Sequence, residues 1–169
     1  HSRIRMSDGE YCEAEKIITT IPWNSYQHIT GLPEDLHLAV KRLKHSSIET
    51  RYVGDTLQTD AQWLYIPDEQ KPYHRILIRH NFCQGSRGYW LETRKERVDM
   101  YSDEAQFCYM NEYAYPLNTI DKPQIMQQLL AFTSERQVYG LGRWGEHCHY
   151  NSDVVVDLAM KLSEKICHE

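Results

Sequence analysis

Apolar and polar positions alternate along the first 21 residues, which is the period of a β-strand. Ile4 and Met6 alternate with polar neighbours, residues 7–10 have the composition of a turn, and residues 16–21 form a short apolar run. Pro22 lacks the N–H group that a strand needs and ends this run. The pattern predicts two strands joined by a turn, the second of them buried.

A helical period follows. Leu36, Val40 and Leu43 recur at helical spacing within residues 31–44, and Pro33 stands in the permitted first turn with acidic residues behind it. We expect a helix there and a shorter one within residues 23–29.

Residues 46–95 return to a period of two. Turn-forming segments separate the candidate strands, which are residues 47–54, 62–66, 74–81 and 88–94. A further strand is expected at residues 107–117, whereas the pattern of residues 96–108 fits neither a helix nor a strand clearly. Alternation in the third strand would place Arg75 and Arg79 on one face and Ile76 and Ile78 on the other. These arginines fit a solvated sheet face or, alternatively, an anion-binding cleft.

The last third of the chain combines a strand, a glycine-rich segment and a helix. Residues 123–132 have a helical pattern, and residues 137–139 begin a strand that leads into the glycines. Asn151, Ser152 or Asp153 can cap a second helix. Its apolar residues at helical spacing are Val155, Leu158, Ala159, Leu162 and Ile166. We therefore predict a strand, a glycine–arginine loop, and a helix whose N-terminus points back at that loop.

The three glycines match G-x-G-x-x-G but not its context. In a dinucleotide fingerprint a helix opens within Gly140, Gly142 and Gly145, and an acidic residue follows about 20 positions later on a second strand. Here residues 146–151 intervene with no helical pattern. The predicted helix start and Arg143 could instead receive phosphate, carboxylate or an electron-rich ring edge. The alternative is an ordinary connection in which Arg143 makes a surface salt bridge.

Composition narrows the class of protein. The 169 residues are enough for one domain, and a net charge of −5 argues against a nucleic-acid polymer as partner. No apolar run is long enough to span a membrane, and no signal peptide is visible. Five scattered cysteines indicate reduced thiols, so we expect a cytoplasmic protein. The adjacent His147, Cys148 and His149 do not have the spacing of a zinc site.

The order of several motifs resembles the C-terminal half of UDP-galactopyranose mutase-like flavoproteins, within the wider flavin amine oxidase and protoporphyrinogen oxidase superfamily. The motifs are KIITTIP (16–22), GLPEDL (31–36), YAYP (113–116), GRWGE (142–146) and NSD (151–153). The resemblance implies an α+β fold in which a substrate-binding sheet domain is joined to the closing strand, loop and helix of an FAD domain. It also implies that an N-terminal Rossmann unit, which holds the ADP half of FAD, precedes this chain.

The resemblance carries roles to particular residues. Arg143 matches an arginine beside the flavin and the substrate phosphates, and Asp153 an acidic residue near the ribityl chain. Together with Gly142, Asn151 and Ser152 these form the implied cofactor site. The implied substrate-binding residues are Tyr115, His149 and Tyr150. His149 stands where bacterial mutases carry a phosphate-binding tyrosine. The implied reaction is attack of reduced flavin on the sugar's anomeric carbon, loss of UDP and ring contraction.

The sequence thus predicts three regions. Residues 1–30 end the FAD-domain strands, residues 31–118 form the substrate-binding sheet, and residues 119–169 supply the return helix, the glycine–arginine loop and the closing helix. We expect a fragment of a FAD-dependent enzyme that acts on a nucleotide-sugar or other small molecule and is inactive by itself. Two alternatives stay open, namely an amine-oxidase-like oxidoreductase and a cofactor-free binding module of the same fold.

Overall fold

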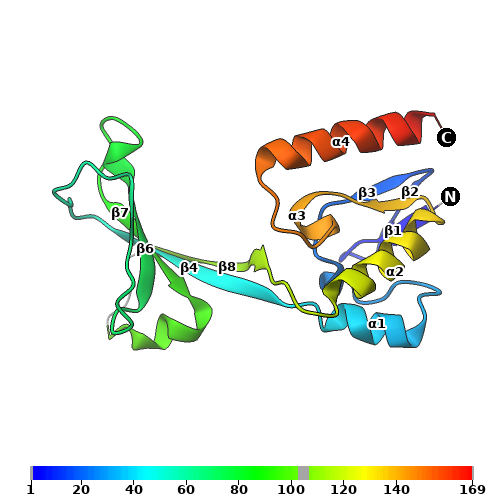
Figure 1. Cartoon of the computed structure of the whole chain (residues 1–169), viewed down its shortest axis with the longest axis horizontal. Helices are drawn as coiled ribbons and strands as arrows, with labels where there is room; N and C mark the ends of the chain where they lie inside the picture. The colour runs from blue at the N-terminus through cyan, green and yellow to red at the C-terminus, as the bar shows by residue number, and fades with distance from the viewer. Residues whose placement is uncertain (1, 103–106, 169) are drawn as a thin grey trace. The chain divides into compact units, whose positions relative to one another are not determined.

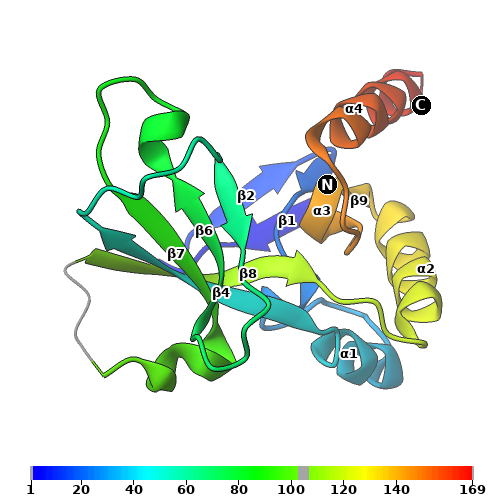
Figure 2. The ribbon, with the colours of Figure 1, turned by 60° about the vertical axis from the view of Figure 1, so that its left-hand side comes forward.

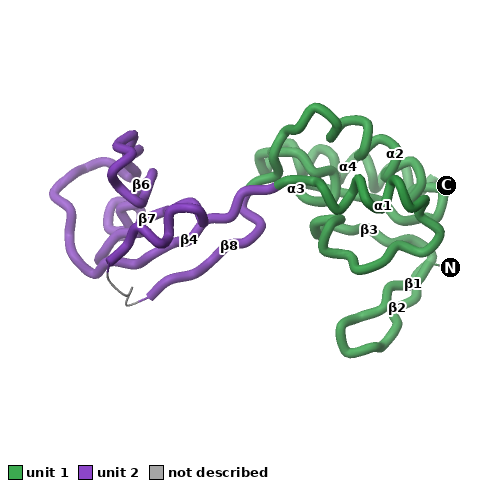
Figure 3. The backbone as a smooth tube through the Cα atoms, turned by 90° about the horizontal axis from the view of Figure 1, so that it is seen from below, with its two compact units in different colours: residues 1–44, 115–169 green, residues 45–114 purple. Residues whose placement is uncertain are grey.

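The chain has an α+β fold, as the sequence predicts. The computed structural model describes residues 2–102 and 107–168, and Figure 1 shows its helices and strands, most of them labelled. The chain divides into two compact units, which Figure 3 colours separately: residues 1–44 with 115–169, and residues 45–114. The first is called unit 1 and the second unit 2.

Unit 1 begins with a hairpin. Strand β1 (Ser2–Arg5) pairs antiparallel with β2 (Tyr11–Ala14), and the Met6 N–H donates to the Glu10 carbonyl across the predicted turn. The sequence pattern did not predict β2 as a separate strand. Its residues are mostly exposed and show no apolar alternation, so the hairpin rests on backbone pairing.

A parallel pair of strands lies next in unit 1. Strand β3 (Ile17–Thr19) pairs with β9 (Val138–Gly140), and the register sets Ile18 beside Tyr139. Within the described residues these two strands form a sheet of their own. Ile18 is 47% exposed on it. The expected burial of this strand is therefore only partly realised, because Thr19 is buried and Ile18 is not.

Two helices build the core of unit 1. Helix α1 (Glu34–Lys41) packs against α2 (Lys122–Ser134) and against a 3-10 turn, η1 (Trp23–Ser25). The core is formed by Trp23, Leu36, Val40, Leu43, Ile125, Met126 and Leu129. The helix expected within residues 23–29 is thus a single turn, because the chain is already extended at Tyr26.

Helix α4 (Ser152–Cys167) is the last element of unit 1. It starts after the N-cap Asn151, one of the three capping residues that the sequence offers. The five apolar residues at helical spacing are all half-buried. On the remaining surface of α4, Val154, Val156 and Met160 are exposed. No residue of α4 is fully buried, so this helix carries more apolar surface than unit 1 covers.

The predicted glycine–arginine loop is in fact a single helical turn, α3 (Gly142–Gly145). The Glu146 N–H donates to the Gly142 carbonyl at 3.0 Å, and the Cys148 N–H donates to the Arg143 carbonyl at 2.9 Å. Gly142 has φ 76°, a left-handed conformation that glycine adopts without strain. Short helical turns show no apolar period, and the sequence pattern could not reveal this one.

Unit 2 is a sheet of five strands in the order β5-β6-β7-β4-β8 (Figure 2). The strands are β4 (His45–Val53), β5 (Trp63–Tyr65), β6 (Tyr73–Ile78), β7 (Tyr89–Arg94) and β8 (Phe107–Pro116). The pairs β4–β7, β5–β6 and β6–β7 are antiparallel. Ile76, Ile78 and Leu91 form the buried core of one face.

The strand predicted at residues 74–81 ends earlier. After Ile78 the chain enters a 3-10 turn, η2 (Arg79–Asn81), so Arg79 does not continue the face of Arg75. Arg75 instead pairs with Glu92 at 2.6 Å. The ambiguous interval 96–108 includes another 3-10 segment, η3 (Lys95–Met100), and its residues 103–106 lie outside the described part of the chain.

The helices of residues 2–102 and 107–168 are all too short or too polar to cross a membrane.

Two glycines allow the backbones of unit 1 to approach one another closely. A Cβ atom on Gly145 would lie 2.3 Å from the Thr19 carbonyl oxygen, and one on Gly140 would lie 2.1 Å from the Gly145 carbonyl oxygen. Both obstacles are backbone atoms, which cannot rotate away as side chains do.

We therefore predict that Gly145→Ala destabilises the chain by about 3 kcal/mol, at the upper end of overpacking costs. Urea unfolding measures the change. Gly54→Ala is the matched control, because a Cβ there meets no atom within 4 Å. Equal stability of the two variants would contradict the close approach.

Candidate functional site

The helical turn α3 is fixed onto the parallel strands by backbone contacts. The Leu141 N–H donates to the Thr19 carbonyl at 2.9 Å, which extends the β3–β9 pairing by one step. From the other side, the buried indole Nε1 of Trp23 donates to the Gly145 carbonyl at 2.7 Å. The turn is thus held at both ends, and the direction of the Arg143 side chain follows from it.

Arg143 is half-buried and is held from two directions. Its Nη2 donates to the Tyr150 carbonyl at 3.0 Å, and its guanidinium carbon lies 5.3 Å from the centre of the Tyr115 ring. Within the described residues it makes no ion pair, so the surface salt bridge considered above does not form. A guanidinium has five N–H donors, and most of those of Arg143 stay available to a ligand.

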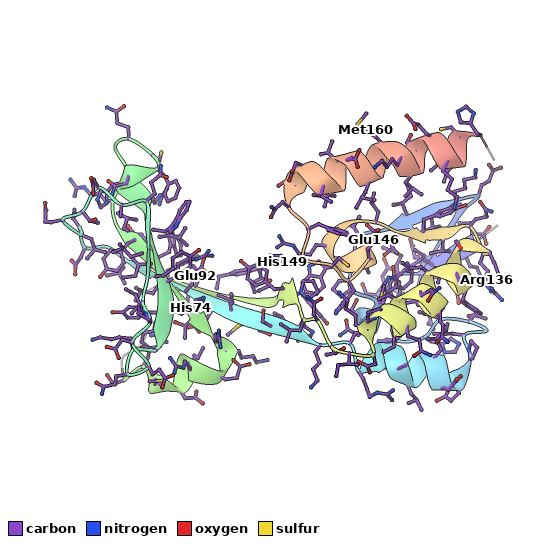
Figure 4. The ribbon with its side chains drawn as sticks, in the orientation of Figure 1. His74, Glu92, Arg136, Glu146, His149 and Met160 are labelled. Carbon is purple, nitrogen blue, oxygen red and sulfur yellow. The ribbon has the colours of Figure 1, made fainter. Side chains whose placement is uncertain are left out.

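Tyr115 and His149 extend this contact. Their rings meet edge to face, with centroids 4.8 Å apart at an interplanar angle of 62°. Tyr115 comes from the end of β8, whereas His149 lies in the segment between α3 and α4 (Figure 4). The structure therefore brings Arg143, Tyr115 and His149 together from two distant parts of the sequence.

Tyr150 takes part in a different way from the one the sequence implied. Its backbone carbonyl anchors Arg143, while its hydroxyl donates a hydrogen bond toward Cys148. That hydrogen bond, with a smaller contribution from burial, raises the pKa of Tyr150 to about 12. The phenol is consequently a neutral donor at physiological pH.

The first turn of α4 presents backbone N–H groups beside this cluster. Asn151 is the N-cap, in an extended conformation, and its side chain makes no capping hydrogen bond. Asn151, Ser152 and Asp153 are all exposed and follow directly after Tyr150. The uncapped N–H groups offer donors and a partial positive charge, and Asp153 adds a carboxylate acceptor.

The Glu146 side chain folds back onto the first residue of α3. Its Oε2 accepts a hydrogen bond from the Gly142 N–H at 3.1 Å. Burial raises the pKa of Glu146 above that of an ordinary carboxyl group, and the hydrogen bond from Gly142 opposes the shift only in part. The carboxyl group therefore resists ionisation more in the folded chain than in the unfolded one.

Sequence reasoning missed a buried polar cluster behind the site. Lys122, at the start of α2, donates from Nζ to the His147 carbonyl at 3.1 Å and to Cys148 Sγ at 3.7 Å. His147 is 1% exposed, and its Nε2 lies 3.1 Å from the Lys44 carbonyl oxygen. Because 26 residues separate Lys122 from Cys148, no local spacing could have indicated the pair. The only local signal was the unusual run of polar residues after the glycines.

Two further features concern the remaining polar and concave surfaces. Among residues 2–102 and 107–168, no group of three or more His, Cys, Asp or Glu residues is placed to hold a metal ion. In unit 2, a shallow open concavity of about 450 Å³ is lined by Tyr52, Arg79, Trp90 and Phe107. Its three rings form an aromatic surface within the sheet unit.

The chain combines two kinds of unit: an antiparallel sheet, and a unit that carries a short parallel pair of strands, a glycine–arginine turn and a C-terminal helix. Among solved structures, this chain is similar to one described as reduced UDP-galactopyranose mutase, with a TM-score of 0.66 and 19% sequence identity. The similarity covers 85% of this chain and 38% of the mutase chain. At this identity it shows a shared fold.

Sequence comparison with protein families and with curated proteins assigns the chain to no family. No protein-family model matches the chain, and no curated protein matches it. The chain spans well under half of the mutase chain that it resembles.

The raised pKa of Glu146 predicts a pH dependence of stability. Between the ordinary carboxyl pKa and the raised one, the folded chain binds more protons than the unfolded chain, so stability falls as pH rises through this window. Glu146→Gln removes the ionisation, so its stability relative to the wild-type chain should increase from pH 4 to pH 7.

Urea unfolding of both proteins across this range measures the difference. Glu164→Gln, on an exposed position of α4, is the matched control and should show no such trend. A difference between Glu146→Gln and wild type that stays constant with pH would contradict the assignment.

Proposed function

We propose that this chain is the C-terminal portion of a FAD-dependent enzyme that resembles UDP-galactopyranose mutase and acts on a nucleotide-sugar. The observation that carries the proposal is the convergence of Arg143, Tyr115 and His149 beside the start of α4, in a fold similar to that of the mutase. In this proposal residues 31–118 bind substrate, while residues 1–30 and 119–169 belong to the FAD domain.

Arg143 is proposed to bind the substrate's pyrophosphate. Its unused donors have the fork geometry that phosphate oxygens accept, and its charge is not neutralised by any ion pair in the described residues. Positive charge at this point would offset the charge that develops on a departing nucleoside diphosphate. This makes Arg143 the proposed catalytic residue.

The neighbouring side chains are proposed to position the substrate. Tyr115 holds the guanidinium against its ring and can present its hydroxyl to a phosphate. His149 is exposed and abuts Tyr115 edge to face. Tyr150 acts mainly by anchoring Arg143 through its carbonyl.

The residues at the start of α4 fit the FAD that the fold implies. The uncapped N–H groups can donate to an electron-rich edge of a flavin, and Asp153 can accept from ribityl hydroxyls. Gly142 has φ 76°, a backbone conformation that residues with a side chain rarely adopt, and so leaves no side chain at this point. When bound and reduced, FAD supplies the nucleophile or the electrons of the reaction. Gly142, Arg143, Asn151, Ser152 and Asp153 would hold it.

The parallel pair β3–β9 favours the proposal that an N-terminal Rossmann unit of the same protein packs against this chain. Parallel strands normally belong to larger sheets covered by helices on both faces. Here the pair stands alone in the described residues, with Ile18 half-exposed, and α4 has unburied Val156 and Met160. Additional parallel strands from an N-terminal unit would extend the β3–β9 sheet and would cover the exposed apolar side chains of this sheet and of α4.

An amine-oxidase-like oxidoreductase is the second candidate. Three rings of the concavity in unit 2, those of Tyr52, Trp90 and Phe107, favour it, because an aromatic surface suits an apolar amine substrate better than a diphosphate. The positive charge of Arg79 in the same lining opposes it. The absence of UDP binding by the full-length flavoprotein would favour this candidate.

The chain alone is expected to bind FAD only weakly, because the unit that would hold the ADP half is not part of it. Titration of the chain with FAD, followed by flavin fluorescence, should give a dissociation constant above about 100 μM, corresponding to less than about 5.5 kcal/mol of binding free energy. Submicromolar binding would contradict the division of the cofactor between two parts of the protein.

The role of Arg143 predicts loss of nucleotide binding. In the full-length protein, Arg143→Ala should weaken UDP binding about 10- to 100-fold, as expected for a charge-assisted hydrogen-bonding partner. Calorimetric titration with UDP measures the change.

Arg136→Ala is the matched control, since Arg136 also stacks on a ring in unit 1, that of Phe132, but is exposed. It should bind UDP as the wild-type protein does. UDP binding that is equal in Arg143→Ala and the wild-type protein would sink the proposed role.

A further inference from the structure

One face of the unit 2 sheet carries a row of aromatic rings. The strand register sets Trp63 beside Leu77 and Leu77 beside Trp90. It also sets Trp90 beside Tyr52, so the row crosses four strands on a single face. Leu91, the next residue of β7, points to the opposite face and joins the buried core there. The aromatic row is therefore not part of the core of this unit.

Three rings enclose a concavity on this face. The Phe107 ring meets the Trp90 ring edge to face, with centroids 5.9 Å apart, and the Tyr52 and Trp90 ring centroids are 5.1 Å apart. These rings and Arg79 line a volume of about 450 Å³. Small-molecule sites occupy roughly 300–1,000 Å³ and are lined mainly by apolar and aromatic side chains with a few polar groups. The concavity has this size and this kind of lining.

The Tyr52 ring is held in place by the turn before β7. Its hydroxyl donates to the Arg87 carbonyl at 3.1 Å. A Cβ on Gly88 would lie 2.5 Å from the Tyr52 ring and 2.5 Å from the Val53 carbonyl oxygen, so the ring rests directly on glycine backbone. A ring that is already fixed loses little freedom when a ligand packs against it.

Arg79 adds a positive charge that is not neutralised. It is exposed in η2, and within the described residues its guanidinium group makes no ion pair and no hydrogen bond. Its backbone N–H donates to the Gly88 carbonyl at 3.2 Å, which fixes η2 beside the Tyr52 ring. A guanidinium group presents a fork of donors that matches a carboxylate or a phosphate. A cationic ligand would be repelled.

We propose that the concavity lined by Tyr52, Arg79, Trp90 and Phe107 binds a flat aromatic ring that bears an anionic group. The ligand's ring packs against the three aromatic side chains, and its carboxylate or phosphate accepts hydrogen bonds from Arg79. All four lining residues belong to unit 2, so the site needs neither Arg143 nor FAD. Aromatic carboxylates and nucleotides both have this chemistry.

Titration of the 169-residue chain with naphthoate tests the proposal. The chain has four tryptophans, and the NMR signals of their indole N–H groups report where the ligand binds. The signal of Trp90, identified with Trp90→Phe, should shift. The signal of Trp23, whose N–H is bonded to the Gly145 carbonyl in unit 1, should not. Naphthamide has the same ring without the charge and should bind about tenfold more weakly.

Two variants at exposed positions separate the charge from the ring surface. Arg79→Gln should weaken naphthoate binding about tenfold and leave naphthamide binding unchanged. Phe107→Ala should weaken both ligands about fivefold, because each loses one aromatic contact. Arg42→Gln, at an exposed position after α1, is the matched control and should bind both ligands as the wild-type chain does.

Uridine monophosphate and uridine distinguish the two sources of such a ligand. Uridine monophosphate that binds more tightly than naphthoate, and about tenfold more weakly to Arg79→Gln, supports the site and indicates a nucleotide. The reverse order of affinities supports the site and indicates an aromatic acid.

Three results would overturn the proposal. The first is a Trp90 signal that naphthoate and uridine monophosphate leave unshifted. The second is equal affinity for naphthoate and naphthamide, or an affinity for naphthoate that is unchanged in both Arg79→Gln and Phe107→Ala. The third is a Trp90 signal that moves with protein concentration when no ligand is present, since a second copy of the chain would then cover this face.

Discussion

The close approach of α3 to the parallel strands is the constraint on which the site of unit 1 depends. Gly145 lies so near the Thr19 carbonyl that no side chain fits, and the Trp23 indole fixes the Gly145 carbonyl from the core. These contacts tie the first strand region, the core and the last third of the chain together. The course of the chain beyond Gly145, including the anchor of Arg143 at Tyr150, follows from them.

The segment from Arg143 to the start of α4 carries polar groups on two sides, and these groups find their hydrogen-bond partners in different ways. On one side Arg143, Tyr115 and the uncapped start of α4 leave donors available to a ligand. On the other, Lys122 takes up the His147 carbonyl and the Cys148 sulfur within the interior. Unpaired polar groups are costly when buried, so the interior side is fully hydrogen-bonded while the outer side is not. One short stretch of chain thus separates the donors of Arg143 from the buried polar cluster around Lys122.

The sequence predicted elements whose pattern is local. Periodicity located α1, α2, α4 and most strands of the sheet, and capping residues located the start of α4. It missed β2, overextended β6 past Ile78, and took the turn α3 for a loop, because none of these depends on apolar spacing. The contact of Arg143 with Tyr115 and that of Lys122 with Cys148 arise only on folding. The roles implied for the site residues stay predictions.

The visible absorbance spectrum of the purified full-length protein tests the central claim most directly. If this chain completes a flavoenzyme, the protein as purified, or after incubation with FAD and removal of the excess, shows the absorbance bands of bound flavin. A colourless protein that cannot be loaded with FAD contradicts the account and leaves a cofactor-free binding module with the same fold.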